Sequence, residues 1–287
     1  MTYDLLERDV LPEVAPSSRS EKPTTRVSLF GFQLDLVGMS EAVETIYSWI
    51  AGGEQTCRFV VTPNVDHAVL YQKHAGLRRA YANASLVLAD GMPVVAVARL
   101  LGHAIPGRVA GSDLAPALFD AAGLHGSLRV YLLGAGPGVA ERAAKNITSR
   151  WLDVEVVGTY SPPLGFERDP DENDRILAQI AAARPDVLLV GLGAPKQELW
   201  VNAHRDRIEA AAALCIGATI DFLAGEKRRA PRWMRRVGLE WLHRVASEPR
   251  RLFGRYARDA WAFPRLVWRE WAASAGRRVS HGAASNG

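Results

Sequence analysis

Residues 186–200 read Asp186-Val-Leu-Leu-Val-Gly-Leu-Gly-Ala-Pro-Lys-Gln-Glu-Leu-Trp200. The apolar run at 187–190 is short and continuous, which predicts a fully buried strand. Gly191 and Gly193 follow it, and glycine lets the backbone turn sharply while leaving its N–H groups uncovered. This order of a strand and a glycine turn is typical of an α/β fold with a parallel sheet.

A helix is predicted directly after this turn. Pro195 suits the first turn of a helix, which would carry Lys196 and Gln197 near its start. Backbone amides and the helix dipole then point to one place, where an anion is stabilised. We therefore predict a phosphate-binding corner, and a turn kept only for packing is the alternative.

Similar strand and helix patterns recur along most of the chain. The apolar, turn-bounded segments that predict strands are 58–62, 86–89, 128–133, 154–157, 187–190 and 213–217. Helical patterns separate most of them, and a hairpin is expected from Arg26, followed by a helix capped by Ser40. Alternation of this kind predicts a doubly wound, mostly parallel, Rossmann-like sheet.

Polar or glycine residues stand directly after most of these strands. Parallel sheets bind ligands at the carboxyl ends of their strands, so these residues are expected to share one crevice. They are Thr62, Asn64, Asp90, Gly134, Gly136, Gly193, Gln197 and Asp221.

Asp90 is the candidate for acid–base chemistry. It follows a buried strand and precedes Gly91, which leaves space beside the carboxyl group. Partial desolvation there would raise its pKa toward the range of a general base. The alternative is a cap on the helix that begins near Pro93. Asp66 and His67 also lie close enough in sequence for a catalytic pairing, but a lone histidine near a helix start is more often structural, so this pairing is a secondary hypothesis.

The stretch Gly134-Ala-Gly-Pro-Gly138 resembles part of a dinucleotide fingerprint. Its spacing differs from G-x-G-x-x-G, and no acidic residue ends a following strand at the expected distance, which disfavours NAD. A nucleotide diphosphate resting on the turn and a close packing contact both remain open.

The sequence predicts neither a cofactor nor a metal site. Asp169-Pro-Asp171 could hold a divalent cation, but it lies in a charged loop that enters a helix, with Asp171 or Asn173 as the expected cap. No His or Cys cluster has metal-ligand spacing. A site without metal has to neutralise a diphosphate with Arg, Lys and backbone amides.

Composition bounds the class of protein. With 287 residues, 48% of them hydrophobic, the chain can form a large α/β domain. No apolar run reaches the roughly 18–20 residues of a membrane span, and the start has no signal-peptide pattern. Two cysteines, Cys57 and Cys215, lie in or beside apolar segments, so buried free thiols are expected.

Charge and tryptophan are concentrated near the C-terminus. The segment 227–278 holds fifteen Lys and Arg against four Asp and Glu, a net charge of about +11, while the rest carries about −7. Five of the eight tryptophans also lie there. We predict that this segment is an appendage lying on an anionic membrane, because indoles favour the headgroup level. A nucleic-acid patch or a solvated face is the alternative.

The boundaries that follow are a disordered leader at 1–25, an α/β core at 26–226, the appendage at 227–278 and a disordered tail at 279–287.

The motifs together resemble the WecG/TagA/CpsF family, glycosyltransferase family 26, over about Val27 to Trp268. The segments that carry the resemblance are Thr62-Pro-Asn64, Ala89-Asp-Gly-Met-Pro-Val-Val95, Arg108-Val-Ala-Gly-Ser-Asp-Leu114, Gly191-Leu-Gly-Ala-Pro-Lys-Gln-Glu198, Gly217-Ala-Thr-Ile-Asp-Phe222, Arg229-Ala-Pro231, Gly238-Leu-Glu-Trp241 and Glu248-Pro-Arg-Arg251.

The resemblance implies an inverting, metal-independent transfer from a UDP-sugar to a polyprenyl-diphosphate-linked sugar. Asp90 would be the general base. Thr62, Asn64 and Gln197 would position the donor, with Arg108 facing its sugar or phosphates. Arg244, Arg251 and Arg255 of the appendage would close the site and meet a diphosphate.

The donor sugar would be N-acetylmannosamine, its uronic acid or glucose, used in cell-surface polysaccharide synthesis. The protein would be cytoplasmic and peripheral on the inner face of the bacterial plasma membrane, with no nucleic-acid partner and with possible homo-oligomers. The competing hypotheses are a nucleotide-dependent oxidoreductase and a non-catalytic nucleotide-binding module.

Overall fold

A six-stranded parallel sheet forms the centre of the computed structural model, which describes residues 25–53, 56–231, 233–234 and 238–284. Its strand order is β4-β3-β8-β7-β5-β6, and every pairing is parallel. The strands are β3 (Arg58–Val61), β4 (Leu86–Val87), β5 (Leu128–Gly134), β6 (Val154–Tyr160), β7 (Val187–Gly191) and β8 (Ala212–Cys215). The prediction of a doubly wound parallel sheet is confirmed.

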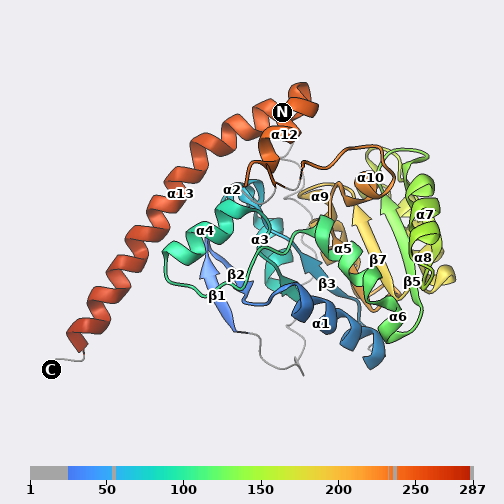
Figure 1. Ribbon diagram of the computed structural model, residues 1–287, viewed down its shortest axis with the longest axis horizontal. Coiled ribbons are helices and arrows are strands. Elements are labelled where there is room, and N and C mark those ends of the chain that lie inside the picture. The colour runs from blue at the N-terminus through green and yellow to red at the C-terminus, as the bar shows by residue number, and fades with distance from the viewer. Residues whose placement is uncertain (1–24, 54–55, 232, 235–237, 285–287) are drawn as a thin grey trace.

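Helices cover both faces of this sheet (Figure 1). Side chains alternate along each strand, so that Phe59 and Val61 pack on one face and Val60 on the other. The first face carries α2 (Val65–Tyr71), α3 (Ala75–Asn83), α4 (Met92–Leu100), η1 (Phe166–Arg168), α8 (Pro170–Ala183) and α9 (Lys196–His204). The second carries α1 (Met39–Gly52), α5 (Gly111–Asp120), α6 (Ala122–His125), α7 (Val139–Arg150) and α10 (Thr219–Leu223).

The expected hairpin at the start of the core is present. Strands β1 (Arg26–Leu29) and β2 (Phe32–Asp35) pair antiparallel in a separate sheet. Asp35 is buried and accepts from the Arg26 guanidinium and, at 2.8 Å, from the backbone N–H of Val87. This carboxylate therefore attaches the hairpin to β4.

Two predicted helix starts were wrong. The N-cap of α1 is Gly38, and Glu41 accepts from its backbone N–H at 2.7 Å, so Ser40 lies inside the helix. Helix α8 is capped by Asp169, whose carboxylate accepts from two backbone N–H groups of the first turn. Asp171 and Asn173, the expected caps, lie within α8 because Pro170 already occupies its first position.

Other boundaries also differ from expectation. The single helix expected after β3 is divided into α2 and α3, because the ring of His74 accepts from the Leu77 N–H and starts a new helix. The strand expected at 154–157 continues to Tyr160. Cys57 and Cys215 are free and buried, as predicted.

The basic C-terminal segment lies against the core as two helices. Helix α12 (Glu240–Ser247) is followed by α13 (Pro249–Ala284), which packs beside α2 and extends away from the body of the molecule (Figure 1). Leu252 and Leu266 of α13 are buried, and the ring of Phe263 lies 5.3 Å from that of Phe30. The appendage therefore packs on the core through one apolar stripe.

The ends of the chain were expected to be disordered. Most of the predicted leader, residues 1–24, lies outside the described residues, as do 285–287. Helix α13 continues to Ala284, into the segment predicted as a disordered tail. Within the described residues, no helix has the length and hydrophobicity needed to cross a membrane.

Candidate active site

A cavity of about 430 Å³ lies at the carboxyl ends of β3, β4, β7 and β8, between the core and the appendage. This volume falls within the usual range for small-molecule sites. The core side is lined by residues that include Thr62, Asn64, Asp90, Arg108, Gly193 and Gln197. The appendage side is lined by residues that include Glu240, Trp241, Arg244, Arg255, Tyr256 and Asp259.

Asp90 lies on the core side of this cavity. The N-cap of α4 is Gly91 at φ 92°, and no side chain caps that helix, so the capping alternative for Asp90 is wrong. Burial raises the pKa of Asp90 to about 6, although Arg108, Arg244 and His67 oppose this rise. Its side chain is 24% exposed, so the carboxyl group is within reach of a ligand. A carboxyl group of this kind can take a proton near neutral pH.

Arg108 connects the two sides of the cavity. Its guanidinium lies 3.9 Å from Asp90, donates to Asp113 at 2.8 Å and donates to Glu240 of α12 at 3.1 Å. Arg229 donates to the other oxygen of Asp113 at 2.8 Å. Arg108 and Arg229 thus share Asp113, and Arg108 joins Asp90 and Asp113 of the core to Glu240 of the appendage.

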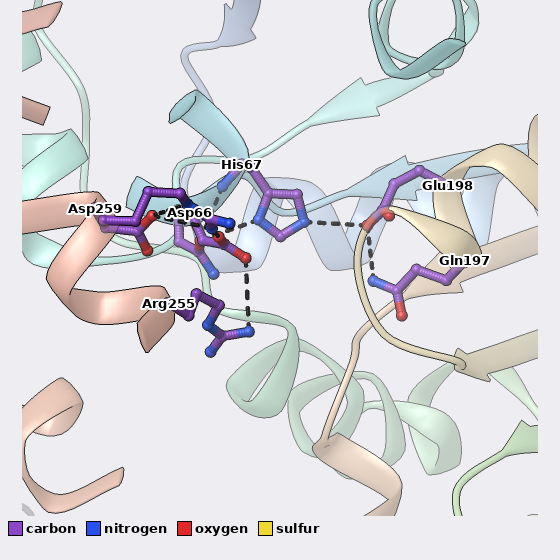
Figure 2. Close-up of polar contacts among 8 residues, drawn as sticks. Asp66, His67, Gln197, Glu198, Arg255 and Asp259 are labelled. Carbon is purple, nitrogen blue, oxygen red and sulfur yellow. Dashed lines mark hydrogen bonds and ion pairs between the residues drawn. The ribbon is translucent and has the colours of Figure 1, made fainter. Parts of the chain in front are cut away.

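Four polar side chains form a chain of hydrogen bonds beneath the core side. His67 Nδ1 lies 3.0 Å from Asn64 Oδ1, and His67 Nε2 lies 3.2 Å from Glu198 Oε1. Gln197 donates to the same Glu198 oxygen at 2.7 Å (Figure 2). Burial alone would lower the pKa of His67, but Glu198, with Asp66 and Asp90, raises it above the ordinary value.

Ion pairs hold α13 against α2. Arg255 lies 3.6 Å from Asp66, and Arg258 also pairs with Asp66. Figure 2 shows Asp259 beside this group, and burial together with the charge of Asp66 raises the pKa of Asp259 to about 6. Within the described residues, the buried Nε of Arg255 has no hydrogen-bond partner. Arg255 also lines the cavity.

Arg244 and Arg251 are the other two appendage arginines predicted for the site. The Arg244 guanidinium lies 5.7 Å from the ring centre of Phe222 and lines the cavity. Arg251 belongs to α13, but its side chain lies outside what the structure describes.

Four predicted site residues do not line this cavity: Gly134, Gly136, Lys196 and Asp221. The expectation that all the residues after strands converge there was wrong for the two glycines and Asp221, because β5 lies beyond β7 and Asp221 pairs with Lys227 at 3.5 Å. A Cβ on Gly134 would lie 2.6 Å from the backbone of Gly191, which is a packing contact that requires glycine. Lys196 pairs with Glu167 at 3.2 Å. Their predicted ligand contacts stay predictions.

Sequence reasoning missed several residues of the site. It left His67 secondary and did not consider Glu198, because their contact joins positions 131 residues apart. Asp66 was considered only together with His67, and Glu240 and Asp259 were missed, since no local pattern shows which acids face the appendage arginines. The only early signal for Glu198 was its place beside Gln197 in the turn after β7.

Large aromatic side chains are exposed on the appendage. Trp261 and Trp268 of α13 are each 66% exposed and, being seven residues apart, share one face of the helix. Trp233, Trp241, Phe253 and Trp271 are also exposed.

In the part of the chain that the structure describes, no group of three or more His, Cys, Asp or Glu could hold a metal ion.

Comparison with known proteins gives one consistent result. The sequence model of the glycosyl transferase WecG/TagA/CpsF family matches residues 27–277, which is most of the chain. Relatives from Staphylococcus aureus strains MW2, NCTC 8325 / PS 47 and MRSA252 are 28% identical over 232 residues, covering 80% of this chain and 87% of theirs. Each is named as an N-acetylglucosaminyldiphosphoundecaprenol N-acetyl-beta-D-mannosaminyltransferase.

Proposed function

The chain belongs to the WecG/TagA/CpsF family of glycosyl transferases, and from this premise we propose that it moves a hexose from a UDP-sugar to a sugar linked to a polyprenyl diphosphate. The relatives named above act on a diphosphoundecaprenol-linked N-acetylglucosamine. N-acetylmannosamine is accordingly the first donor sugar to test, before its uronic acid and glucose.

The observation that carries this proposal is the position of Asp90. It shares one cavity with Thr62, Asn64 and Gln197 on the core side and with the appendage arginines on the other. A carboxylate with a pKa of about 6 is mostly ionised at neutral pH and can accept the proton of an acceptor hydroxyl.

The proposed reaction is a single displacement. Asp90 removes the proton from the acceptor hydroxyl while that oxygen attacks the anomeric carbon from the face opposite UDP. The bond to the UDP oxygen breaks, and the configuration at the anomeric carbon inverts. Arg244 and Arg255, which line the cavity, neutralise the charge of a diphosphate, so that the reaction proceeds without a metal ion.

The appendage is proposed to bring this cavity to the lipid-linked acceptor. Its exposed tryptophans and its net charge of about +11 suit the interface of an anionic membrane. The protein would then work peripherally on the cytoplasmic face of the bacterial plasma membrane, as a monomer or as a homo-oligomer.

A transfer assay tests the proposal directly. Purified protein is incubated with each UDP-sugar and with N-acetylglucosamine linked to a polyprenyl diphosphate, with and without EDTA, and the lipid product is identified by mass spectrometry. We expect one added hexose, in the inverted configuration and unaffected by EDTA. Absence of transfer from every UDP-sugar, or binding of NAD(P) in place of UDP, would contradict the proposal.

A further inference from the structure

Two amide side chains of the candidate site, Asn64 and Gln197, are connected beneath the cavity by His67 and Glu198. The connection is buried: His67 is 7% exposed and Glu198 is fully buried. A buried polar chain of this kind favours the arrangement in which each donor meets an acceptor. Within the described residues Glu198 Oε2 has no hydrogen-bond partner, so the contacts of Oε1 are the ones that join His67 to Gln197.

The orientation of the Asn64 amide follows from its role as the N-cap of α2. Its Oδ1 accepts from the backbone N–H of His67 at 3.3 Å, which identifies that atom as oxygen. The ring Nδ1 of His67 lies 3.0 Å from the same oxygen and must therefore carry a hydrogen. Among the described residues no hydrogen bond uses the Asn64 NH₂ group, and Asn64 lines the cavity.

The Gln197 amide is fixed in the same way. Its Oε1 accepts from the backbone N–H of Gly217 at 3.1 Å, so its nitrogen is the atom that donates to Glu198 at 2.7 Å. One hydrogen of that NH₂ group is left over, and Gln197 also lines the cavity. Both amides can thus offer N–H donors to a ligand.

The two amides depend on a shared proton. With Nδ1 of His67 already bearing a hydrogen, a proton has to lie between Nε2 and Glu198 Oε1, which are 3.2 Å apart. Without this proton, the lone pairs of His67 Nε2 and Glu198 Oε1 would face each other inside the protein, at a large cost in folding free energy. The raised pKa of His67 agrees with a retained proton.

We propose that the buried His67–Glu198 pair is a positioning element that fixes Asn64 and Gln197 with their NH₂ groups toward the oxygen atoms of the bound UDP-sugar. That the ligand is a UDP-sugar rests on the proposed function. His67 also lines the cavity and Glu198 does not, and the proposed effect of the pair on the reaction passes through the two amides.

A double-mutant cycle tests this dependence. His67→Gln keeps a donor for Glu198, because glutamine reaches about as far as Nε2, but it has no donor at the position of Nδ1. We expect kcat/KM for transfer to fall roughly two- to tenfold, the scale of one net hydrogen bond. In an Asn64→Ala background the same change should cost less than about twofold, since the amide it positions is gone.

A histidine outside the cavity provides the control in the same transfer assay. His204, on α9 and packed on Trp200, does not line the cavity, so His204→Gln should leave kcat/KM unchanged in the wild-type and the Asn64→Ala backgrounds. Equal losses from His67→Gln in the two backgrounds, or no loss in either, would overturn the proposal.

A second measurement needs neither a sugar nor a variant. In ¹⁵N-histidine-labelled wild-type protein at pH 7.5, the ring shifts of His67 should show Nδ1 carrying a hydrogen. An unprotonated Nδ1 would overturn the proposal even if transfer occurs. Absence of transfer by the wild-type protein would instead count against the proposed function, and the spectrum would still decide the state of the pair.

Discussion

The two sides of the cavity are built differently. The core side consists of strand ends and buried polar groups, of which Gln197 is 2% exposed and Glu198 fully buried. The appendage side packs on the core through the apolar stripe of α13, and the polar contacts added there are ion pairs in which the Arg255 and Arg258 side chains are 36% and 45% exposed. Partly exposed pairs contribute little to stability and are screened by salt, whereas buried networks define one geometry.

This difference suggests a division of tasks between the two sides. The core side has the rigidity that acid–base chemistry and donor positioning require. The appendage side has the weaker attachment and the exposed aromatic surface expected of an element that meets a membrane. Substitutions on the core side should therefore affect the rate of sugar transfer, and substitutions on the appendage side should affect membrane binding and the docking of the appendage on the core.

The largest effect is expected from Asp90→Asn on the core side. The amide cannot accept the hydroxyl proton, so kcat should fall at least about a hundredfold. The variant should still bind vesicles as the wild type does, because the appendage is unchanged. Steady-state transfer kinetics and vesicle sedimentation measure both properties, and a variant that keeps most of the wild-type kcat would remove Asp90 from its proposed role.

The next effect concerns the appendage alone. Replacing both Trp261 and Trp268 with alanine should weaken binding to anionic vesicles by about ten- to a hundredfold, since each partly inserted side chain contributes roughly 0.7–1.4 kcal/mol at the interface and every change of about 1.4 kcal/mol is tenfold. A Leu152→Ala, Leu164→Ala double variant is the control, because these side chains are 92% and 99% exposed on the core. Unchanged vesicle binding in the tryptophan variant would contradict the assigned task.

A smaller effect is expected where the two sides meet. Gly238 has φ 78°, and a Cβ there would lie 2.9 Å from Met92 of α4. Gly238→Ala should lower Tm by about 2–8 °C, from roughly 1–2 kcal/mol of backbone strain and overlap. Gly225→Ala shares a positive φ, 74°, but meets nothing within 4 Å, so it measures the strain alone. Equal shifts in Tm for Gly238→Ala and Gly225→Ala would show that the contact of residue 238 with Met92 adds nothing to the loss of stability.

The smallest effect is expected from Asp66→Asn, which removes the anion paired with Arg255 and Arg258. The loss of stability should be below about 1 kcal/mol, because both arginine side chains are partly exposed. Backbone amides of the first turns of α13 should nonetheless exchange hydrogen faster, and added salt should have a similar effect on the wild type. Exchange rates that do not change would indicate that apolar packing alone holds α13.

The core side of the site could be predicted because its signals are local. Thr62, Asn64, Asp90 and Gln197 follow apolar runs or a glycine turn, and parallel strands bring such positions to one edge of the sheet. Gly134 follows a similar pattern but does not join them, because the order of the strands depends on packing between distant segments.

The appendage side could be predicted only in outline. Charge and tryptophan content indicated a basic, tryptophan-rich segment, whose contact with a membrane stays a prediction. They did not indicate that Asp66, Asp113 and Glu240 would pair with its arginines or with Arg108. The contact of His67 with Glu198 escaped notice for the same reason, since it depends on how α2 and α9 lie against each other.

The pH dependence of kcat/KM tests the central claim, that Asp90 is the base of a sugar transfer, most directly. Burial raises the pKa of Asp90 to about 6, and only the ionised carboxylate accepts a proton. We predict that wild-type kcat/KM rises with pH through about 6 to a plateau, and that the residual activity of Asp90→Asn lacks this rise on the acid side. An acid limb of the same shape in the variant would contradict it.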